Sequence, residues 1–101
     1  MRVRVTRGAA ARLEAPEDLR RFGLVAEGGL EGEALARALG TAGRLEGGHA
    51  WILPDWLRSA SGRAGDPEWQ AGFARMVEFA AKQGWVDAAG AIRAHIEHDP
   101  A

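Results

Sequence analysis

A histidine and an aspartate lie close to two tryptophans in the middle of the chain, in the segment His-Ala-Trp-Ile-Leu-Pro-Asp-Trp. If residues 49–53 form a strand, His49 and Trp51 share one face of it, because side chains alternate along a strand. Pro54 ends that strand, which leaves Asp55 just beyond its end. A histidine oriented by a carboxylate can act as a general base, so His49 and Asp55 are the candidate catalytic residues.

The tryptophans offer a different function, the binding of a ligand or a partner. The chain has four tryptophans, and an apolar pocket walled by aromatic rings is a normal small-molecule site. We take Trp51, Trp56 and Trp69 as candidate ligand-binding residues, for a small apolar or anionic ligand. The same rings could instead anchor a homodimer or another protein partner. The alternative is that they only fill the core, as aromatic residues commonly do.

Two further histidines, His95 and His98, are three residues apart near the C-terminus. On a helix that spacing places them on one face, where they could hold a divalent metal ion. A structural site needs two more ligands, and no motif supplies them. The main interpretation is therefore a polar, solvated chain end, with no metal and no cofactor expected.

Several classes of chemistry are excluded by composition. The chain has no cysteine, which removes thiolate catalysis and cysteine-held metal clusters. It has neither a phosphate-binding glycine motif nor a nucleophile elbow around a serine. The net charge of −1 provides no general attraction to nucleic acid. The predicted helix and hairpin over 31–53 also carry too few cations for a DNA-reading unit, so no nucleic-acid partner is expected.

The predicted location is the cytoplasm of a bacterium. No apolar run approaches the roughly 20 residues that cross a bilayer, so no membrane association is expected. The first residues, Met-Arg-Val-Arg-Val-Thr-Arg, lack the apolar stretch of a signal peptide. Arginine supplies nearly all the positive charge, with Lys82 the one lysine, and alanine and glycine are abundant. This usage is typical of a GC-rich bacterial genome.

The elements that must position these residues follow from periodicity and turn chemistry. Alternation of Val3 and Val5 with polar residues predicts a strand over 2–6. Residues 16–22 begin with a proline and acidic residues, which predicts a short helix there. A weaker strand is predicted at 24–26. A helix is predicted over 31–39, and the Gly-Gly pair between two apolar runs predicts a hairpin over 44–53.

The second half is predicted to be mainly helical. A short helix begins at Pro54, and the small residues of 59–65 form a mobile surface loop. Asp66 and Pro67 start the strongest helix, over 67–83, whose stripe includes Trp69 and Phe73. A last helix is predicted over 88–98.

These elements predict one α+β domain over residues 1–101, in which a small sheet (a strand near 2–6 and the hairpin near 44–53) packs against about four helices. The leading function is that of a small cytoplasmic bacterial binding or accessory protein, acting through a tryptophan-lined apolar pocket or a homodimer surface. The alternative is a cofactor-independent enzyme using His49 with Asp55. A weaker alternative is divalent-metal binding through His95 and His98. The sequence does not identify the ligand, the partner or the reaction.

Overall fold

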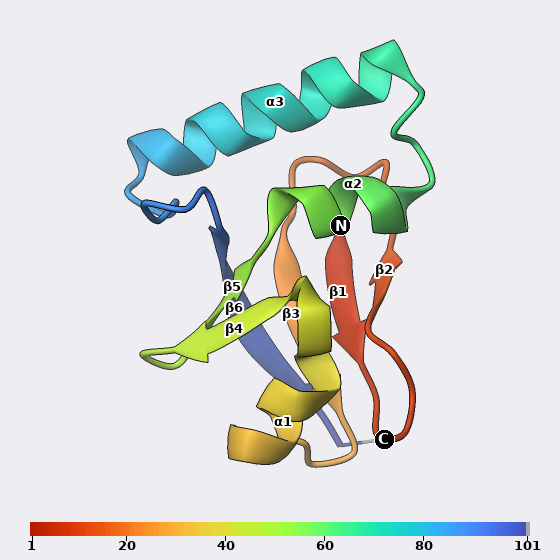
Figure 1. The fold of residues 1–101 in the computed structure, drawn as a ribbon, viewed down its shortest axis with the longest axis vertical. Helices are drawn as coiled ribbons and strands as arrows, with labels where there is room; N and C mark the ends of the chain where they lie inside the picture. The colour runs from red at the N-terminus through yellow and green to blue at the C-terminus, as the bar shows by residue number, and fades with distance from the viewer. Residues whose placement is uncertain (101) are drawn as a thin grey trace.

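The computed structural model describes residues 1–100, and a six-stranded sheet curled into a half-barrel forms its centre (Figure 1). The strands, in chain order, are β1 (Arg2–Val5), β2 (Arg12–Glu14), β3 (Gly23–Glu27), β4 (Gly43–Glu46), β5 (His49–Ile52) and β6 (Ile92–Asp99). The helices are α1 (Gly32–Leu39), α2 (Pro54–Ser61) and α3 (Pro67–Lys82), with a single 3₁₀ turn, η1 (Gly40–Ala42), after α1.

The last strand of the chain lies in the middle of the sheet, whose strand order is β2-β1-β3-β6-β5-β4. β6 pairs in parallel with β3 and antiparallel with β5. β3 also pairs in parallel with β1, while β2 and β4 form antiparallel edges. β6 therefore joins the N-terminal strands to the β4–β5 hairpin in one sheet.

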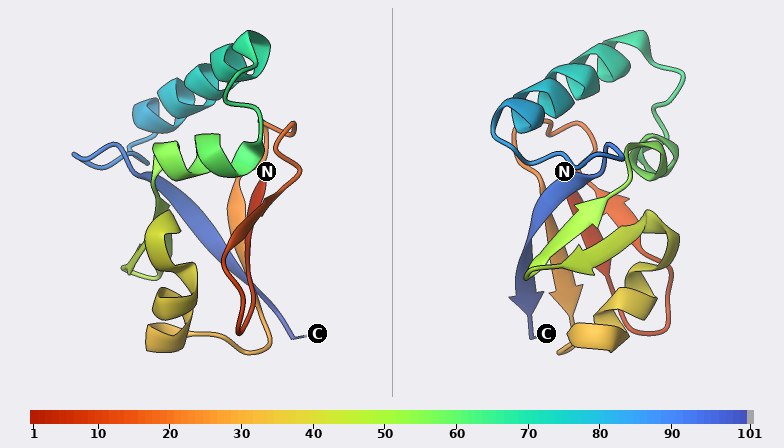
Figure 2. Two further views of the ribbon diagram at one scale, coloured as in Figure 1. Left: turned by 45° about the vertical axis from the view of Figure 1, so that its right-hand side comes forward. Right: turned by 60° about the vertical axis from the view of Figure 1, so that its left-hand side comes forward.

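The hydrophobic core lies on the inner, concave face of this sheet. Alternate residues of the strands point into it and are at most 2% exposed; they are Val3, Val5, Leu24, Ala26, Ala50, Ile52, Ile92 and Ala94. Helices α1 and α2 contribute Leu35, Leu39 and Leu57 to the same core, and they lie at opposite ends of the half-barrel (Figures 1 and 2). The residues between those core positions form the outer face.

Helix α3 crosses the α2 end of the molecule and packs on α2 and on the loop before β3 (Figure 1). Asp66 caps its first turn by accepting hydrogen bonds from the backbone N–H groups of Glu68 and Trp69. The rings of Trp69 and Phe73 stack with centroids 5.0 Å apart. The indole N–H of Trp69 donates to the carbonyl oxygen of Pro16 at 2.8 Å, which fastens the helix to that loop.

The predicted α+β fold with four helices and a helical C-terminal half is wrong. Residues 92–99 form strand β6 instead of a helix. Ile92 and Ile96 are four residues apart, a spacing that fits both a helix and one face of a strand. Ala94 completes the alternation that distinguishes the strand, and the edges of β3 and β5 are both available to pair with it.

The helix predicted over 16–22 is also wrong, because this segment consists of turns. The Met1 ammonium group donates hydrogen bonds to the carbonyl oxygens of Asp18 and Arg21, at 2.9 and 2.8 Å. Leu19 reaches toward Gly72 of α3, where an added Cβ atom would come within 2.7 Å of its Cδ1 atom. Long-range contacts therefore set the path of this loop, in place of local helical bonds.

Other elements are confirmed. β1 occupies the strand predicted over 2–6, and β4 and β5 form the predicted hairpin. Helices α1 and α3 occupy the segments predicted over 31–39 and 67–83. Helix α2 continues to Ser61, so only the second part of the predicted loop over 59–65 is a connection, and its mobility stays a prediction. Within residues 1–100, no helix is long and apolar enough to cross a membrane.

The stability of the α3 packing can be tested at Phe73, which is fully buried and also lies under the Arg58 guanidinium. We expect Phe73→Ala to lower the free energy of unfolding by about 3–5 kcal/mol, because it removes a buried ring and leaves a cavity. Urea denaturation followed by tryptophan fluorescence measures this change. Phe79→Ala is the matched control, since Phe79 lies on the same helix but is 58% exposed. Equal losses in the two variants would contradict this account of the packing.

Candidate functional site

A cavity of about 630 Å³ opens between α3 and the outer face of the sheet, and it is lined by the loop before β3, by α3, and by β5 and β6 with the turn before β6. Leu19, Arg20 and Phe22 come from the loop before β3. Met76, Phe79 and Ala80 come from the second half of α3. The floor is formed by His49, Trp85, Ile92, Arg93 and His95.

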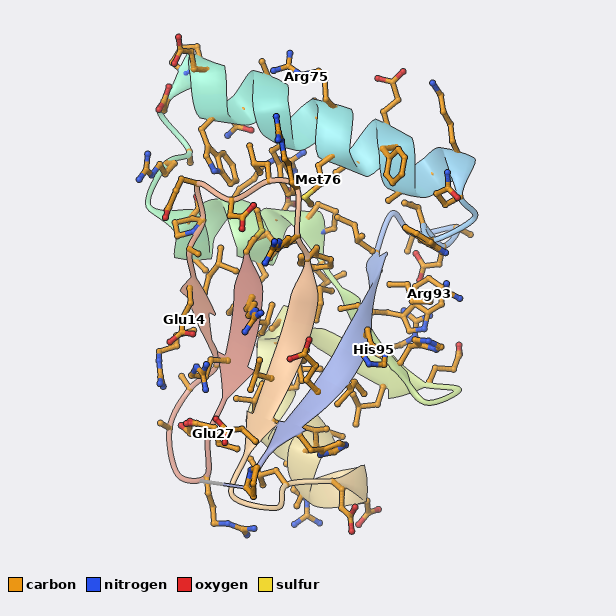
Figure 3. All side chains as sticks on the ribbon, turned by 180° about the vertical axis from the view of Figure 1, so that it is seen from behind. Glu14, Glu27, Arg75, Met76, Arg93 and His95 are labelled. Carbon is orange, nitrogen blue, oxygen red and sulfur yellow. The ribbon has the colours of Figure 1, made fainter. Side chains whose placement is uncertain are left out.

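The floor depends on the pairing of β5 with β6. Trp51 is paired with Arg93 and Ala50 with Ala94, and the next step of the same register places His49 opposite His95. Direct neighbours on one face of an antiparallel pair have Cβ atoms roughly 5 Å apart. Arg93 and His95 are two residues apart on β6 and therefore share the outer face. Figure 3 shows both along β6, beneath the helix that carries Met76.

A tight turn before β6 brings Trp85 beside Arg93. The backbone N–H of Arg93 donates to the carbonyl oxygen of Trp85 at 2.8 Å. The Arg93 guanidinium carbon lies 5.5 Å from the centre of the Trp85 ring, a cation–π contact. The ring of Phe79 also contacts Trp85, in an edge-to-face arrangement with the two ring centres 6.1 Å apart. An arginine and two aromatic rings thus share one end of the cavity.

Asp87 holds this turn in place. Its carboxylate accepts hydrogen bonds from the backbone N–H groups of Ala89 and Ala91, at 3.0 and 2.8 Å. It also accepts one from the Arg44 guanidinium at 2.8 Å. The bond from Ala91 and the ion pair with Arg44 together hold the pKa of Asp87 below its ordinary value.

The structure separates the two residues proposed as a catalytic pair. His49 lines the cavity, whereas Asp55 lies on α2 with its side chain 97% exposed. The Asp55 carboxylate accepts a hydrogen bond from Arg58 at 2.8 Å, and Asp55 is not among the residues that line the cavity. His49 thus reaches the cavity without the carboxylate partner that the sequence offered for it.

The three tryptophans proposed for ligand binding lie outside the lining of the cavity. Trp69 is 5% exposed and belongs to the core, and Trp56 is half-buried against the core. Trp51 lies on the outer face, and the guanidinium carbon of Arg44 lies 5.3 Å from the centre of the Trp51 ring. Its indole N–H is buried without an acceptor among residues 1–100. The tryptophan that does line the cavity is Trp85.

The helical face proposed for His95 and His98 does not exist, because both residues lie on strand β6. Three residues apart on a strand, they point to opposite faces of the sheet. His95 is on the outer face with His49, while His98 is registered with Ala26 of the inner face, near the end of the sheet. No cluster of three or more metal-ligating side chains occurs in the part of the chain that the structure describes.

Sequence reasoning did not assign Arg20, Met76, Phe79 and Arg93 to a site, and it did not bring His49 and His95 to one cavity. One signal was available, namely the alternation of Arg93, His95 and Glu97 with Ile92, Ala94 and Ile96. That pattern describes a strand with one polar face. The role of Arg20 had no local signal, because its loop is placed by contacts with Met1 and α3.

No protein-family model matches the sequence, and neither a curated protein nor a solved structure is significantly similar to it. The function of the cavity therefore has to be inferred from its own side chains.

The hydrogen bonds of Asp87 in the turn before β6 predict that the stability of the protein depends on pH. Because its pKa is lowered by folding, Asp87 stabilises the protein above the pKa it has in the unfolded chain, and this stabilisation is lost as the pH falls through the folded-state pKa. We expect Asp87→Asn to lower the melting temperature at pH 7 and to have a shrinking effect as the pH falls below about 4. Thermal denaturation across this range measures the effect.

Asp55→Asn is the matched control for that experiment, because the Asp55 side chain is 97% exposed and is bonded only to Arg58. We expect this variant to follow the wild type at every pH. A penalty for Asp87→Asn that stayed constant down to pH 2 would contradict the role given to the ionised carboxylate.

Proposed function

We propose that the protein binds a small molecule with an apolar body in the cavity beneath α3. The proposal is carried by one observation, a cavity of about 630 Å³ whose apolar walls come from three separate parts of the chain. This volume lies within the range of roughly 300–1,000 Å³ that is usual for small-molecule pockets. The exposure of Phe79, at 58%, adds support, because this aromatic wall is left uncovered by the chain itself.

Binding is favoured over catalysis by the surroundings of His49. A histidine acting as a general base usually needs a group that orients it. No carboxylate lines the cavity, and Asp55 is engaged by Arg58. We therefore place a binding protein ahead of the enzyme that the sequence also offered. The cytoplasm remains the proposed location.

A homodimer that covers Phe79 with a second copy of the chain is the main competing use of this surface. The two uses can be distinguished by measurement, because the fraction of chains in a dimer rises with protein concentration. Sedimentation velocity over a wide concentration range separates the two uses. A dimer that falls apart on Phe79→Ala substitution would favour the competing use.

The binding proposal can be tested with N-phenylnaphthylamine, an uncharged apolar probe whose fluorescence rises in apolar surroundings. We expect saturable binding of one probe per chain, and we expect Phe79→Ala to weaken it by about five- to tenfold, because the probe loses contact with an aromatic wall. Fluorescence titration measures the affinity, and circular dichroism confirms that each variant is folded.

Leu53→Ala is the matched control, since Leu53 is the other large exposed apolar residue of the described chain, at 41%, and lies outside the cavity. It should bind the probe as the wild type does. Absence of saturable binding to the folded wild-type protein, or equal weakening by the two substitutions, would overturn the proposal.

A further inference from the structure

The polar side chains that line the cavity all belong to basic residues. They are Arg20, His49, Arg93 and His95. The whole chain carries 14 acidic residues against 13 lysines and arginines, yet not one aspartate or glutamate lines this cavity. The cavity therefore departs from the charge balance of the protein that surrounds it.

Two arginines elsewhere on the outer face, Arg4 and Arg44, have acidic partners. The Arg4 guanidinium lies 2.7 Å from a carboxylate oxygen of Glu14 and 3.5 Å from one of Glu27. Arg44 is similarly paired with Asp87, at 2.8 Å. At these two positions the fold supplies a carboxylate to an outer-face cation, which it does not do for the cations of the cavity.

The four basic side chains of the cavity have no such partners. Within residues 1–100, Arg20, His49 and His95 make no side-chain hydrogen bond or ion pair, and Arg93 makes only its contact with the Trp85 ring. Unpaired donors that converge on one apolar space are suited to an acceptor that the chain does not provide.

Three nearby acids do not change this balance. Asp18 accepts a hydrogen bond from the backbone N–H of Arg20 at 3.3 Å but lies outside the lining of the cavity. Glu46 is paired in register with His49, but its carboxylate lies 3.5 Å from the Arg44 guanidinium and outside the cavity. Glu97 follows His95 on the same face of β6, yet it is exposed and also lies outside the lining. An anion in the cavity would therefore meet donors and no carboxylate.

The geometry points to an amphiphilic anion as the ligand of this cavity, and this inference rests on the binding function proposed above. Its anionic head, a carboxylate or a phosphate, takes hydrogen bonds from Arg93, His95 and His49 on the sheet, with Arg20 at the loop. Its apolar body lies against Phe22, Met76 and Phe79. A guanidinium donates two parallel hydrogen bonds to either head group.

The test compares ligands that differ only in the head group, by displacement of bound N-phenylnaphthylamine at pH 7. Decanoate and decyl phosphate are the anionic arms, and decanamide is the uncharged arm. We expect at least one anion to bind about tenfold more tightly than decanamide, because only the anion forms charge-assisted hydrogen bonds. The two anionic arms identify which head group the cavity prefers.

Arg93→Gln and Arg20→Gln test the residues that carry the inference. Each should reduce the ratio of anion affinity to decanamide affinity by about threefold or more. The ratio is informative because general damage to the cavity lowers both affinities together. We expect Arg20→Gln to fold normally, because the Arg20 side chain makes no hydrogen bond or ion pair with another described residue. A change in the affinity ratio of this variant therefore does not come from misfolding. Arg37→Gln on α1, whose side chain is 83% exposed, removes the same charge far from the cavity and should leave the ratio unchanged.

The outcomes separate the two proposals. If decanamide and both anions displace the probe equally well, the preference for an anion is wrong and the apolar binding function stands. If the ratio falls equally in the Arg37→Gln control, the effect is one of net charge and the assigned residues are wrong. If the probe itself does not bind, the proposed function fails and the inference fails with it.

Discussion

The pairing of β6 between β3 and β5 is the interaction on which the rest of this structure depends. Without it, the chain would have a three-stranded N-terminal sheet and a separate two-stranded hairpin, and an isolated hairpin is marginal in water. With it, one curled sheet encloses a core that α1 and α2 close. The same pairing brings His95 opposite His49 and places Arg93 at the floor of the cavity.

The cavity exists because α3 does not lie flat on the sheet. Its first half is fastened by the Trp69–Phe73 stack and by the bond from Trp69 to Pro16. Its second half extends past that anchor toward the start of β6. There Ala80 is buried and Met76 packs against the core, and both line the cavity together with the exposed Phe79. The anchored half is buried at Trp69 and Phe73, and the other half borders the cavity.

Charge is distributed over the outer face in two different ways. On the β1–β2–β3 side, Arg4 is paired with Glu14 and Glu27, so its charge is satisfied within the protein. On the β5–β6 side, the cavity contains basic side chains without acidic partners. Ion pairs at a surface contribute little stability, so this difference says more about recognition than about folding. It is the physical basis for expecting an anionic ligand.

The sequence by itself determined the elements whose signals are local. Val3 and Val5 alternate with polar residues in β1, Gly47 and Gly48 adopt the positive φ angles of a tight hairpin turn, and Asp66 with Pro67 starts α3. It also placed His49 and Trp51 on one face of a strand, from period alone. The spacing of Ile92 and Ile96 suits both a helix and a strand, so the alternation through Ala94 was the one local signal for a strand, and pairing with the free edges of β3 and β5 decided the outcome. Tertiary structure alone decided that His49 shares the cavity with His95 and not with Asp55, since strand register across the sheet, and not proximity in sequence, sets which side chains are neighbours.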